Sequence, residues 1–100
     1  MSKYGMNVKF TAKAGERDAL AQILLGAAAA AEGFEGCEKY IISLSETEPD
    51  AVWVTEIWSG EEAHQASLNN EAGKALIQQA RPLIAGVESY PVRPIGGKGL

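Results

Sequence analysis

The hydrophobic pattern of the chain switches from the period of a strand to the period of a helix within its first third. Apolar and polar residues alternate from Tyr4 to Lys13, as they do along a half-buried strand. From Glu16 to Glu32 the apolar residues recur at spacings of three and four, which places them on one stripe of a helix. The chain is therefore predicted to begin with a strand followed by an amphipathic helix.

Two further strands are predicted to follow as a hairpin. Apolar residues occupy alternate positions between Cys37 and Glu46. The segment from Ala51 to Trp58 is rich in the Val, Ile, Trp and Thr residues that favour strands. Between these two segments, Glu48-Pro49-Asp50 has the composition of a turn.

A second helical region is predicted after the hairpin. Ser59 and Glu62 have the spacing of a capping box, so a helix is expected to begin directly after Ser59. The helical pattern breaks near Asn69-Asn70 and resumes from Glu71 to about Arg81. It ends there because Pro82 disfavours helical geometry at the residue before it.

The last strand is predicted from Val87 to Arg93. Pro91 and Pro94 cannot donate backbone hydrogen bonds, which places this strand at an edge of the sheet. The order of elements is then that of an α+β, ferredoxin-like βαββ(αα)β fold, a four-stranded antiparallel sheet with its helices on one face.

The third strand also predicts a partner subunit. Val52 and Val54 are apolar on one side of it, and Trp53 and Ile57 are apolar on the other. A sheet with one wet face should instead alternate apolar and polar residues. We therefore expect a homodimer, a dimeric α/β barrel, in which a second copy covers the face that the helices leave open.

Length and composition limit the classes of protein that remain. One hundred residues with 46% hydrophobic and 22% charged side chains fit one folded domain over residues 1–100, with a flexible tail at 96–100. The net charge of −4 and the scattered basic residues argue against nucleic acid as a partner. The longest apolar run, Ile23 to Ala31, is too short to cross a membrane. A lone Cys37 and a start without a signal-peptide core favour the cytoplasm.

No cofactor is expected from the motifs. Gly97-Lys98 resembles the end of a phosphate-binding loop, but Gly99 stands where that loop needs Ser or Thr. The glycine pattern of dinucleotide-binding folds is absent. With one His and one Cys, a metal site would have to consist mostly of carboxylates, and the sequence shows no such cluster.

Three residues near the end of the third strand are candidates for catalysis. His64 is the single imidazole, so any chemistry that needs histidine must use it. Trp58 closes the strand just before the helix that carries His64, and Glu56 shares the strand face of Trp58. Burial would raise the pKa of Glu56 and make it a usable base. Each residue also has a purely structural interpretation: a surface or core histidine, a core tryptophan and an exposed edge glutamate.

Three further residues are candidates for binding a substrate. Asn7 could orient a ligand carbonyl or hydroxyl from the first strand, Ser67 shares a helix face with His64, and Arg81 could bind an anion in a bidentate manner. Exposure to solvent is an equally simple interpretation of Asn7 and Arg81.

Two segments carry a resemblance to a known family. The string from Thr55 to His64 and the Ala-Arg-Pro-Leu-Ile-Ala-Gly run of residues 80–86, together with the order of elements, resemble the antibiotic biosynthesis monooxygenase family. The resemblance implies a small ferredoxin-like dimer. It also implies that a quinol or a polyketide phenol is oxidised with molecular oxygen, without flavin, haem or metal. Many relatives carry a histidine where this chain has Ser67, so a proton relay through that position is not implied.

The resemblance also implies roles for the candidate residues. Trp58 matches a tryptophan near the family pocket, His64 falls where a relative places a pocket tyrosine, and Asn7 matches a first-strand asparagine. We therefore predict a cofactor-independent monooxygenase in which His64, with Ser67, takes the phenolic proton and Trp58 forms an aromatic wall. Glu56 is the second candidate base. The alternatives are a non-catalytic ligand-binding dimer of the same fold and an isomerase of a small carbonyl compound.

Overall fold

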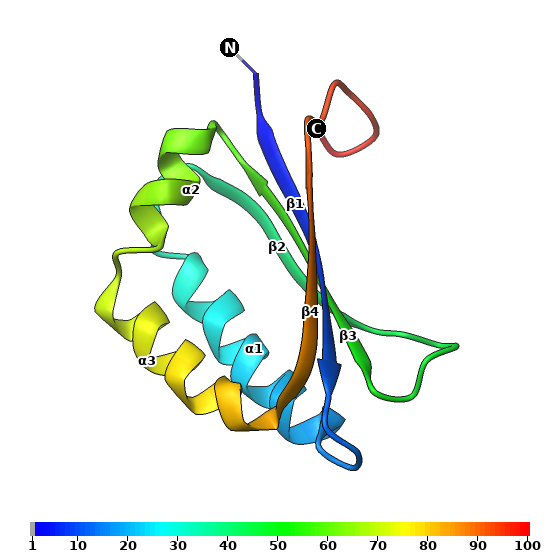
Figure 1. The fold of residues 1–100 in the computed structure, drawn as a ribbon. Coiled ribbons are helices and arrows are strands. Elements are labelled where there is room, and N and C mark those ends of the chain that lie inside the picture. Colours follow the sequence, from blue (N-terminus) through cyan, green and yellow to red (C-terminus); the bar gives the residue numbers. More distant parts are fainter. Residues whose placement is uncertain (1) are drawn as a thin grey trace.

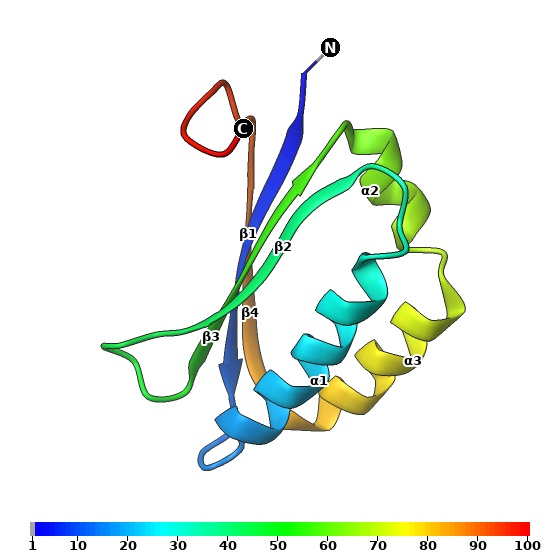
Figure 2. The same cartoon turned by 180° about the vertical axis from the view of Figure 1, so that it is seen from behind.

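A computed structural model describes residues 2–100 and shows a four-stranded sheet with one layer of helices on one of its faces (Figures 1 and 2). In chain order the elements are β1 (Tyr4–Ala12), α1 (Arg17–Ala31), β2 (Cys37–Leu44), β3 (Ala51–Trp58), α2 (Glu61–Ser67), α3 (Glu71–Ala80), a short 3-10 turn η1 (Arg81–Leu83) and β4 (Ile84–Val92). This arrangement confirms the ferredoxin-like fold predicted from the sequence.

The strands lie in the order β2-β3-β1-β4, and every neighbouring pair is antiparallel. β1 is therefore central, and Val8 lies opposite Val54 of β3 and Ser89 of β4. β4 is at an edge, as Pro91 and Pro94 predicted. The right-handed crossover through α1 and the return through α2 and α3 put all three helices on the same face.

Two predicted boundaries were wrong. β4 begins at Ile84 rather than Val87, because a bulge next to Ala12 lets this residue pair with Ile84 and extends the ladder. The capping box does not form, since α2 has Gly60 at its N-cap and no side chain caps it. The backbone amide of Ser59 instead donates to the carbonyl of Gly36 at 2.8 Å, which keeps Ser59 in the loop before the helix.

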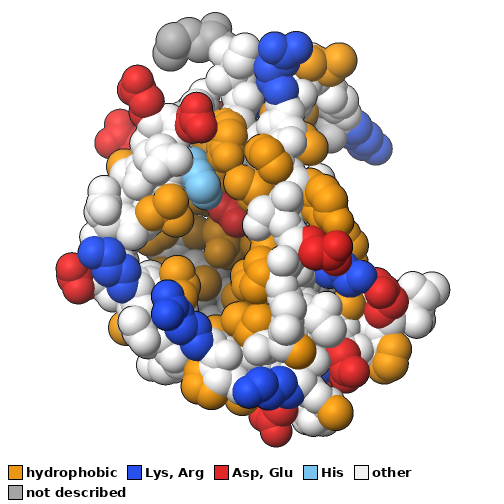
Figure 3. All heavy atoms as spheres, viewed as in Figure 1, with side chains coloured by type: hydrophobic (Ala, Val, Ile, Leu, Met, Phe, Trp, Pro, Cys, Tyr) orange, Lys and Arg blue, Asp and Glu red, His pale blue; other side chains and the backbone are white. Residues whose placement is uncertain are grey.

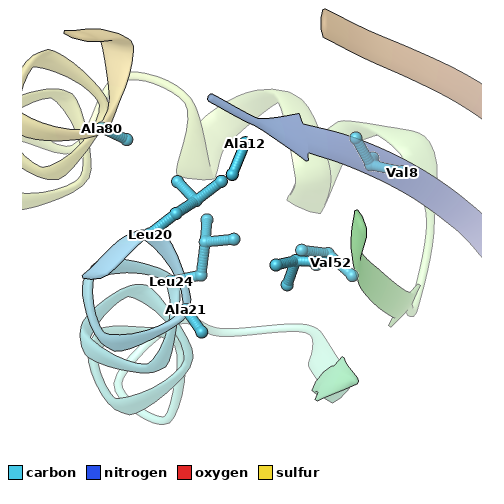
Figure 4. Packing of buried hydrophobic residues seen from close by; sticks show 8 residues of the cluster. Val8, Ala12, Leu20, Ala21, Leu24, Val52 and Ala80 are labelled. Carbon is cyan, nitrogen blue, oxygen red and sulfur yellow. The ribbon is translucent and has the colours of Figure 1, made fainter. Parts of the chain in front are cut away.

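The core lies between the first turns of α1 and the middle of the sheet. Leu20 and Leu24 point from α1 toward the sheet, where they pack in one cluster with Ala12 and Val52 (Figure 4). Leu20 and Val52 are both fully buried. This cluster closes one end of the space between the sheet and the helices.

The opposite face of the sheet has no helices over it and carries apolar side chains. Trp53 and Tyr90 stack there with ring centroids 6.3 Å apart. Ile41, Ile57 and Val92 also lie on this face. Of these apolar side chains, Ile41, Tyr90 and Val92 are 44–48% exposed. Among residues 2–100, no helix has both the length and the apolar character that crossing a membrane requires.

We predict that Leu20→Ala lowers the free energy of unfolding by about 2–5 kcal/mol, because it leaves a cavity at a fully buried position. Urea denaturation followed by circular dichroism measures the change. Leu25→Ala is the matched control on the same helix, since Leu25 is 47% exposed and its loss should change stability by less than about 1 kcal/mol. Equal losses for the two variants would contradict this location of the core.

Candidate functional site

A pocket of about 330 Å³ lies between the helix-covered face of the sheet and the three helices. The hollow is visible in Figure 3, where hydrophobic side chains surround it and the single histidine stands at its rim. Most of its wall is apolar, and neither Lys nor Arg is among the lining residues. Its polar side chains, apart from the Trp58 indole N–H, are Tyr40, Glu56, His64, Ser67 and Ser89.

β3 brings Glu56 and Trp58 into this pocket. The two residues are two positions apart on a strand, so their side chains lie on the same face. Trp58 is 1% exposed, and its Nε1 donates a hydrogen bond of 3.0 Å to Oε1 of Glu56. Phe34, in the loop after α1, stacks on the Trp58 ring with centroids 6.3 Å apart. The indole therefore forms an aromatic wall and also holds the carboxylate.

α2 brings His64 to the same end of the pocket. Its Nε2 lies 3.8 Å from Oε1 of Glu56, which is too long for a direct hydrogen bond. The imidazole packs against the rings of Tyr4 and Trp58, with centroid distances of 5.1 and 5.7 Å. Its Nδ1 is buried and has no hydrogen-bond partner among residues 2–100. Both nitrogens of this buried imidazole therefore lack a direct hydrogen bond from the described protein.

The electrostatics of the pair favour proton exchange at Glu56. Burial raises the pKa of the Glu56 carboxyl, while the Trp58 hydrogen bond and the neighbouring His64 lower it in part. The net effect is a raised pKa, so the Glu56 carboxylate is a stronger base than that of an exposed glutamate.

Four of the six residues predicted from the sequence come together here. Glu56, Trp58, His64 and Ser67 all line the pocket. The Ser67 hydroxyl donates a hydrogen bond of 2.6 Å to the backbone carbonyl oxygen of His64, one helical turn earlier.

The other two residues lie outside the pocket. Asn7 is on the opposite face of the sheet, since Met6 and Val8 on either side of it line the pocket and strand side chains alternate. Arg81 is exposed where α3 passes into η1, and it does not line the pocket either.

Sequence reasoning missed three aromatic residues of the site. Tyr40 lines the pocket from β2, Phe34 packs on Trp58, and Tyr4 packs on His64. The alternation along β2 was a signal for Tyr40, but its position beside Glu56 depends on the register between two strands. In the part of the chain that the structure describes, no group of three or more His, Cys, Asp or Glu side chains could hold a metal ion.

Comparison with known proteins gives a family match and close structural neighbours. The family model described as antibiotic biosynthesis monooxygenase matches residues 4–79. A crystal structure from Chloroflexus aurantiacus J-10-fl, described as a "putative Antibiotic biosynthesis monooxygenase", is 39% identical, with 96% of each chain covered and a TM-score of 0.88.

Two more distant structures share the fold. One from Caulobacter crescentus CB15 bears the same description, at 18% identity, with 95% of this chain and 92% of that one covered and a TM-score of 0.89. One from Bacteroides thetaiotaomicron VPI-5482 is described as "Possible Oxidoreductase", at 18% identity, with coverage of 93% and 98% and a TM-score of 0.86. No curated protein matches the chain.

We predict that Glu56→Gln raises the free energy of unfolding at pH 7. The raised pKa of Glu56 means that its ionised form is less favourable in the folded chain than in the unfolded one. This cost is absent at pH values below the ordinary glutamate pKa of about 4.3 and grows as the pH rises through the folded-state pKa. Gln can still accept a hydrogen bond from Trp58 Nε1 and carries no charge, so the variant avoids this cost. The difference in the free energy of unfolding between the variant and the wild type should therefore shrink as the pH falls.

Urea denaturation at a series of pH values measures this gain. Glu46→Gln, at an exposed position in the turn after β2, is the control for losing a carboxylate. A variant that is less stable than the wild type at pH 7 would show that Trp58 and His64 outweigh the cost of burying Glu56.

Proposed function

Because the chain belongs to the antibiotic biosynthesis monooxygenase family, we propose that it is a cofactor-independent monooxygenase acting on a quinol or a polyketide-like phenol. The observation that carries this proposal is the pair of Glu56 and His64, 3.8 Å apart in a pocket whose wall is mostly apolar. Such a pocket suits a ring system with one acidic hydroxyl at the end where these two side chains lie.

The charge of the pocket favours a substrate that enters as a neutral molecule. No Lys or Arg lines it, and Glu56 is its one carboxylate. An anion would lose its hydration there without gaining a cationic partner, which is costly. A neutral phenol loses less and can be deprotonated after it has bound.

The spacing of the pair suits one hydroxyl group. An oxygen placed about 2.8 Å from each of two atoms that are 3.8 Å apart makes ordinary hydrogen bonds to both. The hydroxyl would donate to Oε1 of Glu56 and accept from Nε2–H of His64. The Trp58 ring would then lie beside the substrate ring as an aromatic wall.

Glu56 would accept the phenolic proton, and His64 would stabilise the oxyanion that forms. The raised pKa of Glu56 brings the basicity of its carboxylate closer to that of a phenolate, which favours the transfer. His64 would keep its own proton and donate a hydrogen bond from Nε2, the nitrogen that faces the carboxylate. Ser67 fixes the carbonyl of His64 and so supports the turn of α2 on which the imidazole stands.

The electron-rich anion would then react with dioxygen directly. The phenolate gives one electron to dioxygen, and the resulting phenoxyl radical and superoxide combine to form a carbon–oxygen bond. For an anthrone-like substrate with a reactive CH₂ group, the O–O bond then breaks. One oxygen atom becomes the new carbonyl, and the other leaves as water with the two hydrogens of the CH₂ group. The protein would bind the anion, exclude water and hold dioxygen next to it.

The apolar outer face of the sheet supports the further proposal of a homodimer. Trp53, Tyr90 and Ile41 lie on this face, and two of them are nearly half exposed. A second copy that packs its own sheet on this face would remove these apolar side chains from water. The pockets would then lie on the outside of the two joined sheets, one under each helix layer.

We expect Trp53→Lys to convert the dimer to a monomer, because it places a charge in the middle of the contact. Sedimentation velocity measures the oligomeric state. Leu25→Lys, which adds the same charge at an exposed position of α1, is the control and should leave the dimer intact. A wild type that sediments as a monomer at micromolar concentration would overturn the homodimer.

We expect the wild type, stripped of metal by a chelator, to consume dioxygen with one or more members of a panel of quinols and anthrone-like phenols. Glu56→Gln and His64→Ala should each lower kcat/KM by about 100-fold or more, because each removes a group that moves or stabilises the proton. Glu46→Gln is the control, since this carboxylate is exposed and outside the pocket.

The product distinguishes the possible reactions. Label from isotopic dioxygen in the product supports a monooxygenase, whereas stoichiometric hydrogen peroxide identifies an oxidase. Binding of the phenols without oxygen uptake above autoxidation would contradict the proposal and favour a ligand-binding protein. Conversion of a carbonyl substrate to its isomer would favour an isomerase.

A further inference from the structure

We propose that Tyr40 is a further catalytic residue of the pocket, whose hydroxyl donates a hydrogen bond to the substrate oxygen that loses its proton. This inference rests on the function proposed above, because it concerns the oxyanion formed next to Glu56. It assigns a role to a side chain that neither the motifs nor the family match singled out.

Strand register places Tyr40 beside the proposed base. Tyr40 of β2 lies directly opposite Glu56 of β3, and both side chains are on the helix-covered face. Side chains in directly opposite positions have Cβ atoms about 4.5–5.5 Å apart. Since both residues line the pocket, a ligand atom bound to the carboxylate lies within reach of a tyrosine hydroxyl on the neighbouring strand.

The Tyr40 hydroxyl is free to bind a ligand. It makes no hydrogen bond to any other residue between positions 2 and 100, although its side chain is largely removed from solvent. Tyr90 provides a contrast, since its hydroxyl donates to Glu88 Oε1 at 3.2 Å on the outer face of the sheet. A partly buried tyrosine hydroxyl usually has a partner, and in this pocket the substrate would supply it.

The protonation states of Tyr40 and Glu56 suit opposite roles. Burial raises the pKa of Tyr40 strongly, and the nearby charge of Glu56 raises it further. Tyr40 therefore keeps its proton and acts as a donor, while the Glu56 carboxylate acts as the acceptor. An acid and a base held next to each other by different environments is a recurring arrangement in enzymes.

The proton balance of the step is simple. The phenol O–H bond breaks, its proton forms a bond with a carboxylate oxygen of Glu56, and the electron pair stays on the phenolic oxygen. Tyr40 and His64 keep their own protons and donate hydrogen bonds to this oxygen. Two donors directed at a developing oxyanion in an apolar pocket are worth more than they are in water.

The test uses 4-nitrophenol as a probe, because its phenolate absorbs visible light and its phenol does not. The wild type and Tyr40→Phe are saturated with the probe, and the pKa of the bound probe is measured by absorbance. We expect Tyr40→Phe to raise this pKa by about one unit, the size of a lost hydrogen bond to a charged group. It should also lower kcat/KM for the best quinol by about tenfold or more.

Two controls separate a catalytic role from a structural one. Tyr90→Phe removes a hydroxyl from the outer face of the same sheet and should leave the pKa of the bound probe unchanged. Nitrobenzene has no hydroxyl, so its affinity should be the same for the wild type and Tyr40→Phe if the pocket is intact. A Tyr40→Phe variant that loses nitrobenzene as well as the anion would show that the residue only shapes the wall, which overturns the inference.

The remaining outcomes distinguish this inference from the proposed function. In one outcome, 4-nitrophenol binds the wild type, and the pKa of the bound probe is the same in Tyr40→Phe as in Tyr90→Phe. The inference is then wrong and the proposed function stands. If the wild type binds none of the phenols, the proposed function is wrong and the role of Tyr40 falls with it.

Discussion

The register of β3 between β1 and β2 is the constraint on which the rest of the molecule depends. Along β3, alternate residues face the helices, so Val52 and Val54 enter the core while Glu56 and Trp58 enter the pocket. A slip of one residue would exchange this set for Trp53, Thr55 and Ile57. The alternation that buries the core therefore also aims the carboxylate and the indole at the space beneath α2.

This shared alternation requires the chain to bury a carboxylate that stability alone would exclude. Glu56 is 9% exposed and accepts one hydrogen bond, from the indole of Trp58. Its second partner, His64, remains 3.8 Å away, beyond hydrogen-bond distance. A buried polar network that is only partly satisfied costs stability, and proteins retain such networks where a ligand completes them. The incomplete contact between these two side chains is thus the clearest local sign of a binding site.

The sequence was sufficient to predict the order and type of the elements, because each has a clear period and the prolines mark the edge strand. It also placed Glu56 and Trp58 on one face, since strand parity is local information. It did not decide which face of the first strand meets the helices, so Asn7 kept two interpretations, a substrate contact and an exposed side chain. Tyr40 was missed for a related reason, because its proximity to Glu56 arises from pairing between two strands.

The helix end near Ser59 shows the same limit. The spacing from Ser59 to Glu62 satisfies the local rule for a capping box, yet Ser59 is held by a backbone hydrogen bond to Gly36, which lies 23 positions earlier. Gly36 has a φ of +86°, and a Cβ at this position would lie 2.7 Å from that of Ala63. A contact between distant segments therefore decided where α2 begins, and with it where His64 stands.

The pocket exists because α1 serves two purposes along its length. Its first half carries Leu20, which is fully buried, and Leu24, which belongs to the same core cluster and also borders the pocket. Its second half carries Ala27 and Ala30, which line the pocket and leave room where larger side chains would have filled it. An unfilled volume costs packing energy, which the dense first half offsets. The core at one end of α1 thus allows an open site at the other, and the polar pair of Glu56 and His64 lies at that open end.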